Sequence, residues 1–170
     1  MKNLIKVMVL AAFVLGAQVV SAQKFARINM QEIISLMPEF KEMQTNLEKF
    51  GKDLQDQLEQ IQVEFNTKAQ EFQKNQATMA ESVKQLKQNE LEQIQSRYQE
   101  FQRVAQEDFQ KKQGELLTPI QKKAQEAVEK VAKASGYLAV FDVSVPILAY
   151  YDTTQMTDLS TAVKTALGIK

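Results

Sequence analysis

The 170-residue chain contains no cysteine, no histidine and no tryptophan, and only five glycines and three prolines. Without histidine and cysteine it lacks the usual general base near neutral pH, the usual activated nucleophile and the commonest zinc ligands. The glycines never stand close together, so the sequence has no glycine-rich phosphate-binding loop. These absences argue against an enzyme, against a metal or organic cofactor, and against a nucleotide as partner.

The chain also has no excess of positive or negative charge. Its 21 Lys and Arg residues balance 21 Asp and Glu residues, which gives a formal net charge of +0 at pH 7. Proteins that bind nucleic acid or another polyanion typically carry a basic patch or stripe. A nucleic-acid partner is therefore not expected.

Residues 1–22 have the parts of a cleaved secretory signal peptide. Lys2 and Lys6 precede the apolar run VMVLAAFVLGA, and the sequence VVSA at 19–22 places small residues at positions −3 and −1 of a cleavage site. The run is short for a transmembrane helix. We expect cleavage after Ala22 and export to the periplasm; the alternative is an uncleaved membrane anchor.

Between residues 39 and 134, apolar residues recur at intervals of eleven. The rows are Leu47, Leu58 and Ala69; Phe50, Ile61 and Phe72; Val83, Ile94, Ala105 and Leu116; and Tyr98, Phe109 and Ile120. Eleven residues in three turns is about 3.67 per turn, close to an undistorted helix, so nearly straight helices are expected. The regular stripe argues against the alternative for Gln-rich sequence, a disordered or prion-like tract.

A single helix of this length would have to bury its stripe against another chain, whereas a hairpin buries it against itself. The best turn signal is KNQATMAES at 74–82, where Thr78 and Glu81 could form a capping box. We expect helices at about 39–75 and 79–134, with the tip near 75–82. In the second helix, Pro119 predicts a kink or a restart with Thr118 as the N-cap.

Strand-forming residues stand at both ends of the mature chain. KFARINM at 24–30 predicts one strand, and YLAVFDV and ILAYYD, on either side of Pro146, predict two more. Gly136 is expected to end the long helix in the left-handed conformation, and 157–170 predicts a closing amphipathic helix. The β body is therefore expected to be discontinuous, with residues 23–38 and 135–170 flanking an inserted arm at 39–134.

This order of elements resembles the Skp/OmpH family of periplasmic chaperones over essentially the whole mature chain. The resemblance is carried by KFARINMQEI, the helical insertion, GELLTPIQKKAQEAVEKVA, GYLAVFDVSVPILAYYD and TDLSTAVKTAL. It implies a mainly α fold with a small β body, and a long antiparallel helical hairpin inserted between strands. It also implies a jellyfish-like homotrimer whose arms enclose a cavity and hold unfolded outer-membrane proteins, without ATP, before membrane insertion.

Candidate client contacts lie in the outer half of the arm, where Met and aromatic side chains could adapt to varied partners. They are Phe65, Phe72, Met79, Val83 and Leu86. The alternative is that these side chains only bury the seam of the hairpin, an alternative that weighs most for the two Phe residues in the eleven-residue rows.

The candidate trimer interface lies in the β body, because three strands are too few to make a stable sheet alone. Its expected residues are Ile28, Tyr137, Val140, Phe141, Ile147 and Tyr150. Packing is expected for the tyrosines of this region rather than a ligand pocket. For Asp142 and Asp152, turn and capping roles are expected rather than a catalytic dyad.

The charge balance departs from the best-known, strongly basic members of the family. Residues 41–134 hold 15 basic and 16 acidic side chains, so long-range attraction of anionic partners should be weak. Lipopolysaccharide binding is therefore not carried over. Two other classes remain open at this stage, a passive structural coiled-coil protein of the envelope and a polyanion binder.

Overall fold

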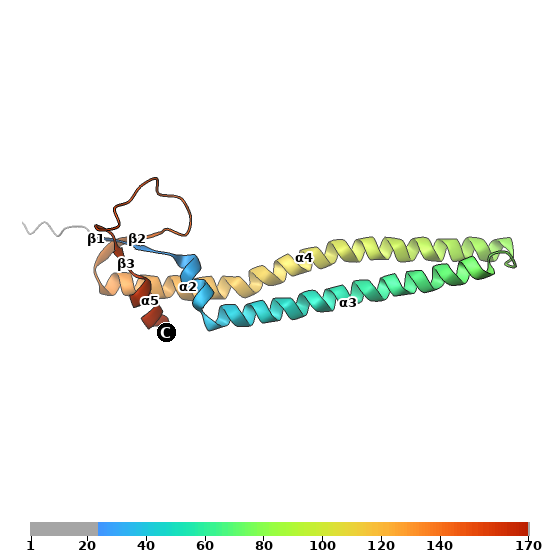
Figure 1. Ribbon diagram of the computed structural model, residues 1–170, viewed down its shortest axis with the longest axis horizontal. Coiled ribbons are helices and arrows are strands. Elements are labelled where there is room, and N and C mark those ends of the chain that lie inside the picture. Colours follow the sequence, from blue (N-terminus) through green and yellow to red (C-terminus); the bar gives the residue numbers. More distant parts are fainter. Residues whose placement is uncertain (1–23, 170) are drawn as a thin grey trace, which may run out of the picture.

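The computed structural model describes residues 24–169, which form a small body at one end of one long helical arm (Figure 1). The predicted signal peptide lies outside the described residues. Along the chain follow β1 (Lys24–Ile28), α2 (Met30–Leu36), α3 (Pro38–Asn75), α4 (Glu81–Ala134), β2 (Tyr137–Asp142), β3 (Thr157–Asp158) and α5 (Ser160–Leu167).

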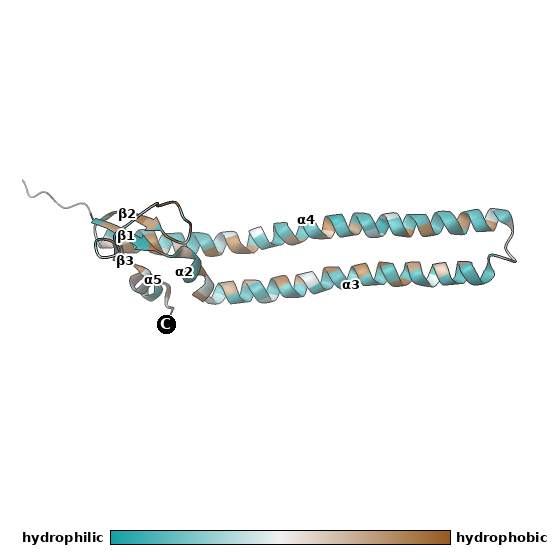
Figure 2. Ribbon diagram, turned by 45° about the horizontal axis from the view of Figure 1, so that its top comes forward, coloured by the Kyte–Doolittle hydropathy of each residue, from teal (hydrophilic) through white to brown (hydrophobic). Residues whose placement is uncertain are grey.

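Helices α3 and α4 are antiparallel and make up the arm, which confirms the predicted hairpin. Pro38 starts α3 at a position where its missing N–H costs nothing. The 38 residues of α3 span about 57 Å at 1.5 Å per residue. Residues 76–80 join the two helices at the far end. Both helices are mostly hydrophilic, with apolar patches at intervals (Figure 2).

The predicted capping box at the start of α4 is wrong. The N-cap is Ala80, which makes no side-chain capping bond. Thr78 instead belongs to the turn that ends α3, because its hydroxyl donates to the carbonyl of Asn75 at 3.0 Å. Glu81 lies in the first turn of α4, where its negative charge favours the helix N-terminus.

Of the kink or restart predicted at Pro119, the restart is wrong, since α4 runs unbroken from residue 81 to 134. The hydroxyl of Thr118 donates to the carbonyl of Gly114, one turn back, at 2.7 Å and does not cap a new helix. Because proline has no N–H, the carbonyl of Glu115 loses its usual hydrogen-bond donor. Both residues are exposed, so water can reach this carbonyl instead.

The two ends of the chain meet in a three-stranded parallel sheet of order β2-β1-β3. Strand β1 pairs with β2 in a register that sets Ala26 opposite Val140 and Ile28 opposite Asp142. Parallel neighbours need a long crossover connection, and between β1 and β2 the whole arm supplies it. Gly136, with φ of 70°, ends α4 just before β2, as predicted.

The strand predicted at 147–152 is wrong, because residues 143–156 form a loop and the third strand is the two-residue β3. Pro146 lies in a turn in which the Ile147 N–H donates to the Val145 carbonyl at 2.8 Å. Both edges of β1 are already paired, with β2 and with β3, so ILAYYD has no free edge of β1 to join.

All but two of the buried hydrophobic residues, Ile94 and Ala105 in the arm, form one cluster under the sheet and at the base of the arm. It consists of Ala26, Ile28, Ile33, Met37, Met43, Leu47, Ile120, Ala124, Ala127, Leu159 and Val163. The small residues Ala124 and Ala127 let the sheet and α5 approach α4 closely. The base of the arm is thus part of the body's core, which fixes the direction in which the arm extends.

Candidate functional site

The seam of the arm is densely packed only near the body. On α3 the buried residues are Met43 and Leu47, both in its first third. Farther out, α4 still buries Ile94 and Ala105, but the α3 side chains that face them are only half-buried. Because packing of an amphipathic face supplies most helix stability, the outer arm is held together more weakly than its base.

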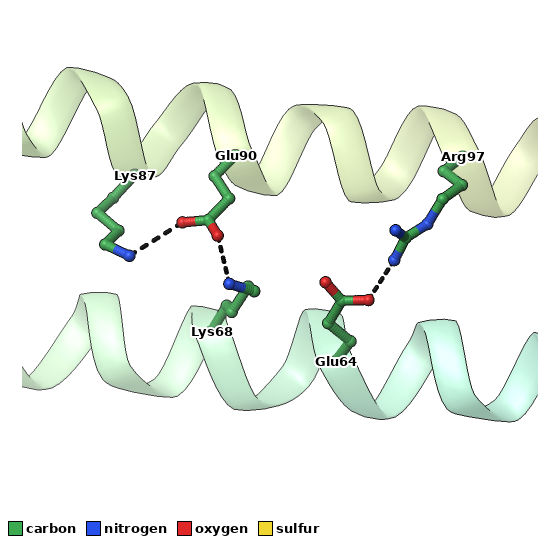
Figure 3. Close-up of polar contacts among 5 residues, drawn as sticks. All are labelled: Glu64, Lys68, Lys87, Glu90 and Arg97. Carbon is green, nitrogen blue, oxygen red and sulfur yellow. Dashed lines mark hydrogen bonds and ion pairs between the residues drawn. The ribbon is translucent and has the colours of Figure 1, made fainter.

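Ion pairs cross between the two helices along one flank of this outer seam. Arg97 on α4 pairs with Glu64 on α3, and Glu90 on α4 pairs with Lys68 on α3 (Figure 3). Glu90 also accepts from Lys87 at 3.0 Å. The hydrogen bonds from Lys68 and then Lys87 lower the pKa of Glu90, so this carboxylate stays ionised at neutral pH.

The opposite flank of the seam carries a groove. Two hollows of about 400 and 760 Å³ share Gln62, Tyr98 and Gln102 in their lining and so run together. Apolar side chains form the floor and glutamines form the walls. The floor is made by Leu54, Leu58, Ile61, Phe65, Ile94, Tyr98 and Phe109, and the walls by Gln55, Gln62, Gln95, Gln99, Gln102 and Gln106. We call this the glutamine groove.

Helical geometry explains why the two flanks differ. At 3.6 residues per turn, Gln55 and Gln62 project to one side of the apolar row of α3, whereas Glu64 and Lys68 project to the other. The apolar rows of the sequence do not by themselves mark either flank as functional. Plotting the residues beside the apolar rows on a helical wheel would have shown the difference.

The five predicted client contacts are spread along the outer arm rather than gathered at one point. Phe65 lies in the floor of the glutamine groove and, like Phe72 and Met79, is half-buried. Val83 and Leu86, just beyond the tip, have 41% and 65% of their surfaces exposed. The outer arm therefore offers separate small apolar patches within a polar surface.

The six predicted interface residues divide between the core and the surface of the body. Ile28, only 2% exposed, belongs to the subunit's own core, against which Tyr137 and Val140 pack. Phe141 lies beside Phe25 with ring centroids 6.1 Å apart. Ile147 and Tyr150, in the loop 143–156, are 79% and 82% exposed.

The acidic residues of the body act as turn and loop anchors. Asp142 accepts from the backbone N–H groups of Ser144, at 2.9 Å, and Met30, at 3.1 Å. Burial opposes ionisation of Asp142, but these hydrogen bonds outweigh it and hold its pKa below the ordinary value. Asp152 accepts from the N–H and the hydroxyl of Thr154, which lowers its pKa. Because both pKa values are lowered, neither carboxyl is suited to act as a general acid.

Two further observations bear on the class of site. Within residues 24–169, no cluster of three or more His, Cys, Asp or Glu side chains could hold a metal ion. No helix in the same range is long and apolar enough to cross a membrane. What the described chain offers is an extended two-helix arm with patchy apolar surface.

Comparison with known proteins agrees with this architecture. The sequence pattern of the family described as "Outer membrane protein (OmpH-like)" matches residues 24–167, most of the chain. The chain belongs to the OmpH-like family. The family is periplasmic and non-enzymatic.

A solved structure shows the same fold for an OmpH-like protein. It is the crystal structure of a candidate outer membrane chaperone (OmpH-like) from Caulobacter crescentus CB15, with 13% sequence identity and a TM-score of 0.72. The match covers 89% of this chain and 88% of the other. No protein among the curated sequences matches this chain. At such low identity the likeness extends to the fold alone.

Proposed function

We propose that this OmpH-like protein is an ATP-independent periplasmic holdase, which binds unfolded outer-membrane proteins and prevents their aggregation before membrane insertion. The observation that carries the proposal is the outer arm, where a weakly packed seam leaves small apolar patches among polar groups. Family membership supports the same class of function.

Binding of this kind depends on many weak contacts. An unfolded barrel precursor exposes apolar strands with unpaired edges, which aggregate with one another. Several patches on one arm, and more on neighbouring arms, would add their weak affinities through high effective concentration. Release needs no nucleotide, because insertion into the membrane removes the unfolded client from the equilibrium.

The client contacts in this proposal are Phe65, Phe72, Met79, Val83 and Leu86. Val83 and Leu86, in the first two turns of α4, are the most exposed of the five, whereas Phe65, Phe72 and Met79 are half-buried. Met and Leu side chains at such a place can contact many different apolar segments without a fixed shape.

We further propose that three copies assemble through the β body, residues 23–38 and 135–170, so that the arms at 39–134 enclose a cavity. The support is the large exposure of Ile147 and Tyr150, together with a sheet whose third strand has two residues. A sheet this small gains stability when further strands join it. Tyr137, Val140 and Phe141 would complete the interface, and Ile28 would support it from within the core.

Delivery to the periplasm would use the cleaved signal peptide at 1–22. The mature chain would then hold 19 basic against 21 acidic residues. With so little net charge, clients would be captured through apolar contacts rather than by electrostatic attraction, and lipopolysaccharide would not be a ligand.

Suppression of aggregation tests the proposal. A denatured outer-membrane barrel protein is diluted into buffer with and without the mature protein while light scattering is followed. We expect scattering to fall as the mature protein is added. Scattering that does not change would favour the passive structural role instead.

A further inference from the structure

The glutamine groove differs from the rest of the arm in its chemistry. Its polar walls are amides, and Glu59 is the one charged residue in its lining. The opposite flank carries the charged residues Glu64, Lys68, Glu90 and Arg97, all engaged in ion pairs. We propose that the glutamine groove binds an extended, uncharged polypeptide segment whose backbone pairs with the glutamine amides. This inference rests on the proposed function and names the surface that carries it.

Glutamine amides match the chemistry of an unpaired backbone. Each amide offers N–H donors and a carbonyl acceptor, the same groups that an extended chain presents along its edges. Among the six wall residues, Gln62 alone has a side-chain hydrogen bond within residues 24–169, to Asn66 at 3.2 Å. The other five amides are free to pair with a bound chain.

The size and floor of the groove fit a short strand. From Gly51 to Phe65 along α3 the lining extends about 21 Å at 1.5 Å per residue. An extended chain covers that length with about six residues at 3.3 Å each. In such a chain alternate side chains point the same way, so one set would lie on Leu58, Ile61 and Ile94 while the other faces water.

The neutral lining selects against charged segments. A Lys or Glu side chain pressed onto the apolar floor would lose water without gaining a partner, which is unfavourable. Segments that alternate apolar with uncharged polar residues avoid this cost. The groove would therefore take the membrane-spanning strands of a barrel precursor rather than its charged loops.

A peptide pair tests whether backbone pairing occurs. The probe is a soluble ten-residue peptide that alternates apolar residues with threonine and serine, and binding to the mature protein is followed by fluorescence anisotropy. The second peptide has the same sequence with alternate backbone nitrogens methylated. Loss of two or three net hydrogen bonds should weaken binding by about tenfold or more. Equal affinity of the two peptides would overturn the inference.

A matched set of substitutions tests the location. Gln99→Met, Gln102→Met and Gln106→Met together remove three wall amides and keep side-chain length and helix propensity. We expect the unmethylated peptide to bind several-fold more weakly. The control combines Gln57→Met, Gln60→Met and Gln93→Met, which lie away from the groove, and should leave affinity unchanged. Stronger binding by the groove variant would show a purely apolar site and contradict the inference.

The aggregation assay separates failure of the groove from failure of the proposed function. If the unaltered protein suppresses aggregation but the peptide experiments fail, the glutamine groove is not the client site and the holdase function stands. If the unaltered protein does not suppress aggregation, the holdase function itself fails, whatever the peptides show.

Discussion

Phe109 on α4 packs directly over Gly51 on α3. A Cβ atom added to Gly51 would lie 3.2 Å from a ring carbon of Phe109, tighter than ordinary van der Waals contact. Both residues line the larger hollow of the glutamine groove. The glycine therefore lets the aromatic ring cross the seam at the point where the compact base gives way to the open outer arm.

Two glycine substitutions measure this contact. Gly114→Ala meets nothing within 4 Å, so it should raise the free energy of unfolding by about 1 kcal/mol through helix propensity alone. Gly51→Ala improves helix propensity equally, but its methyl group must displace Phe109. The increase in the free energy of unfolding should therefore be smaller than for Gly114→Ala. Urea denaturation followed by circular dichroism compares them. An equal or larger gain for Gly51→Ala would show that the Phe109 contact imposes no cost.

Pro119 lies inside α4 with no break in the helix. Pro119→Ala should restore the backbone bond to the Glu115 carbonyl and increase stability, by up to about 3 kcal/mol if the helix now bears the full cost of proline. Thermal unfolding checks this. An unchanged or lower transition temperature would indicate that the ring of Pro119, which packs near Leu116 and Ile120, contributes more than the lost hydrogen bond.

The pKa of Glu90 reports on the ion pairs across the arm. Because its folded-state pKa lies below 4.5, the ionised carboxylate stabilises the folded arm above that pH. The contribution is lost as the pH falls through the lowered pKa. NMR titration of the Glu90 carboxyl should show the depression, and Lys68→Met with Lys87→Met should move the pKa back toward 4.5. A pKa that does not move would mean the lysines do not contact Glu90 in solution.

The division into body and arm predicts that the body survives loss of the arm. Of the buried cluster, replacing 45–110 with a short flexible linker removes only Leu47. The shortened protein should keep cooperative unfolding and sediment as a trimer, like the intact protein, in analytical ultracentrifugation. Loss of cooperative unfolding would contradict the domain division, and a stable folded monomer of the intact protein would contradict the trimer.

The sequence predicted the arm well because helical periodicity is a local property repeated over many turns. The rows that include Leu47 and Ile94 are enough to indicate two long helices that pack on each other. The third strand could not be predicted in the same way. Thr157 and Asp158 show no strand pattern. They become a strand only because they lie beside the edge of β1 that β2 does not occupy.

ILAYYD illustrates the converse case. Its residues favour strands, but β propensity depends on a partner edge, and the described chain leaves these residues in an exposed loop. The apolar rows alone do not show the glutamine groove either. A helical wheel separates the Gln flank of each helix from its charged flank, but the groove also depends on which flank of α3 meets which flank of α4. Its walls are Gln residues that resemble all the other Gln residues of the arm.

Light scattering shows directly whether the arm holds the client. A denatured outer-membrane barrel protein is diluted into buffer that contains either the intact mature protein or the form with 45–110 replaced. We expect the intact protein to suppress scattering in proportion to its concentration and the armless body to leave scattering unchanged. Scattering unaffected by the intact protein, or suppressed equally by the body alone, would contradict the claim that the arm holds the client.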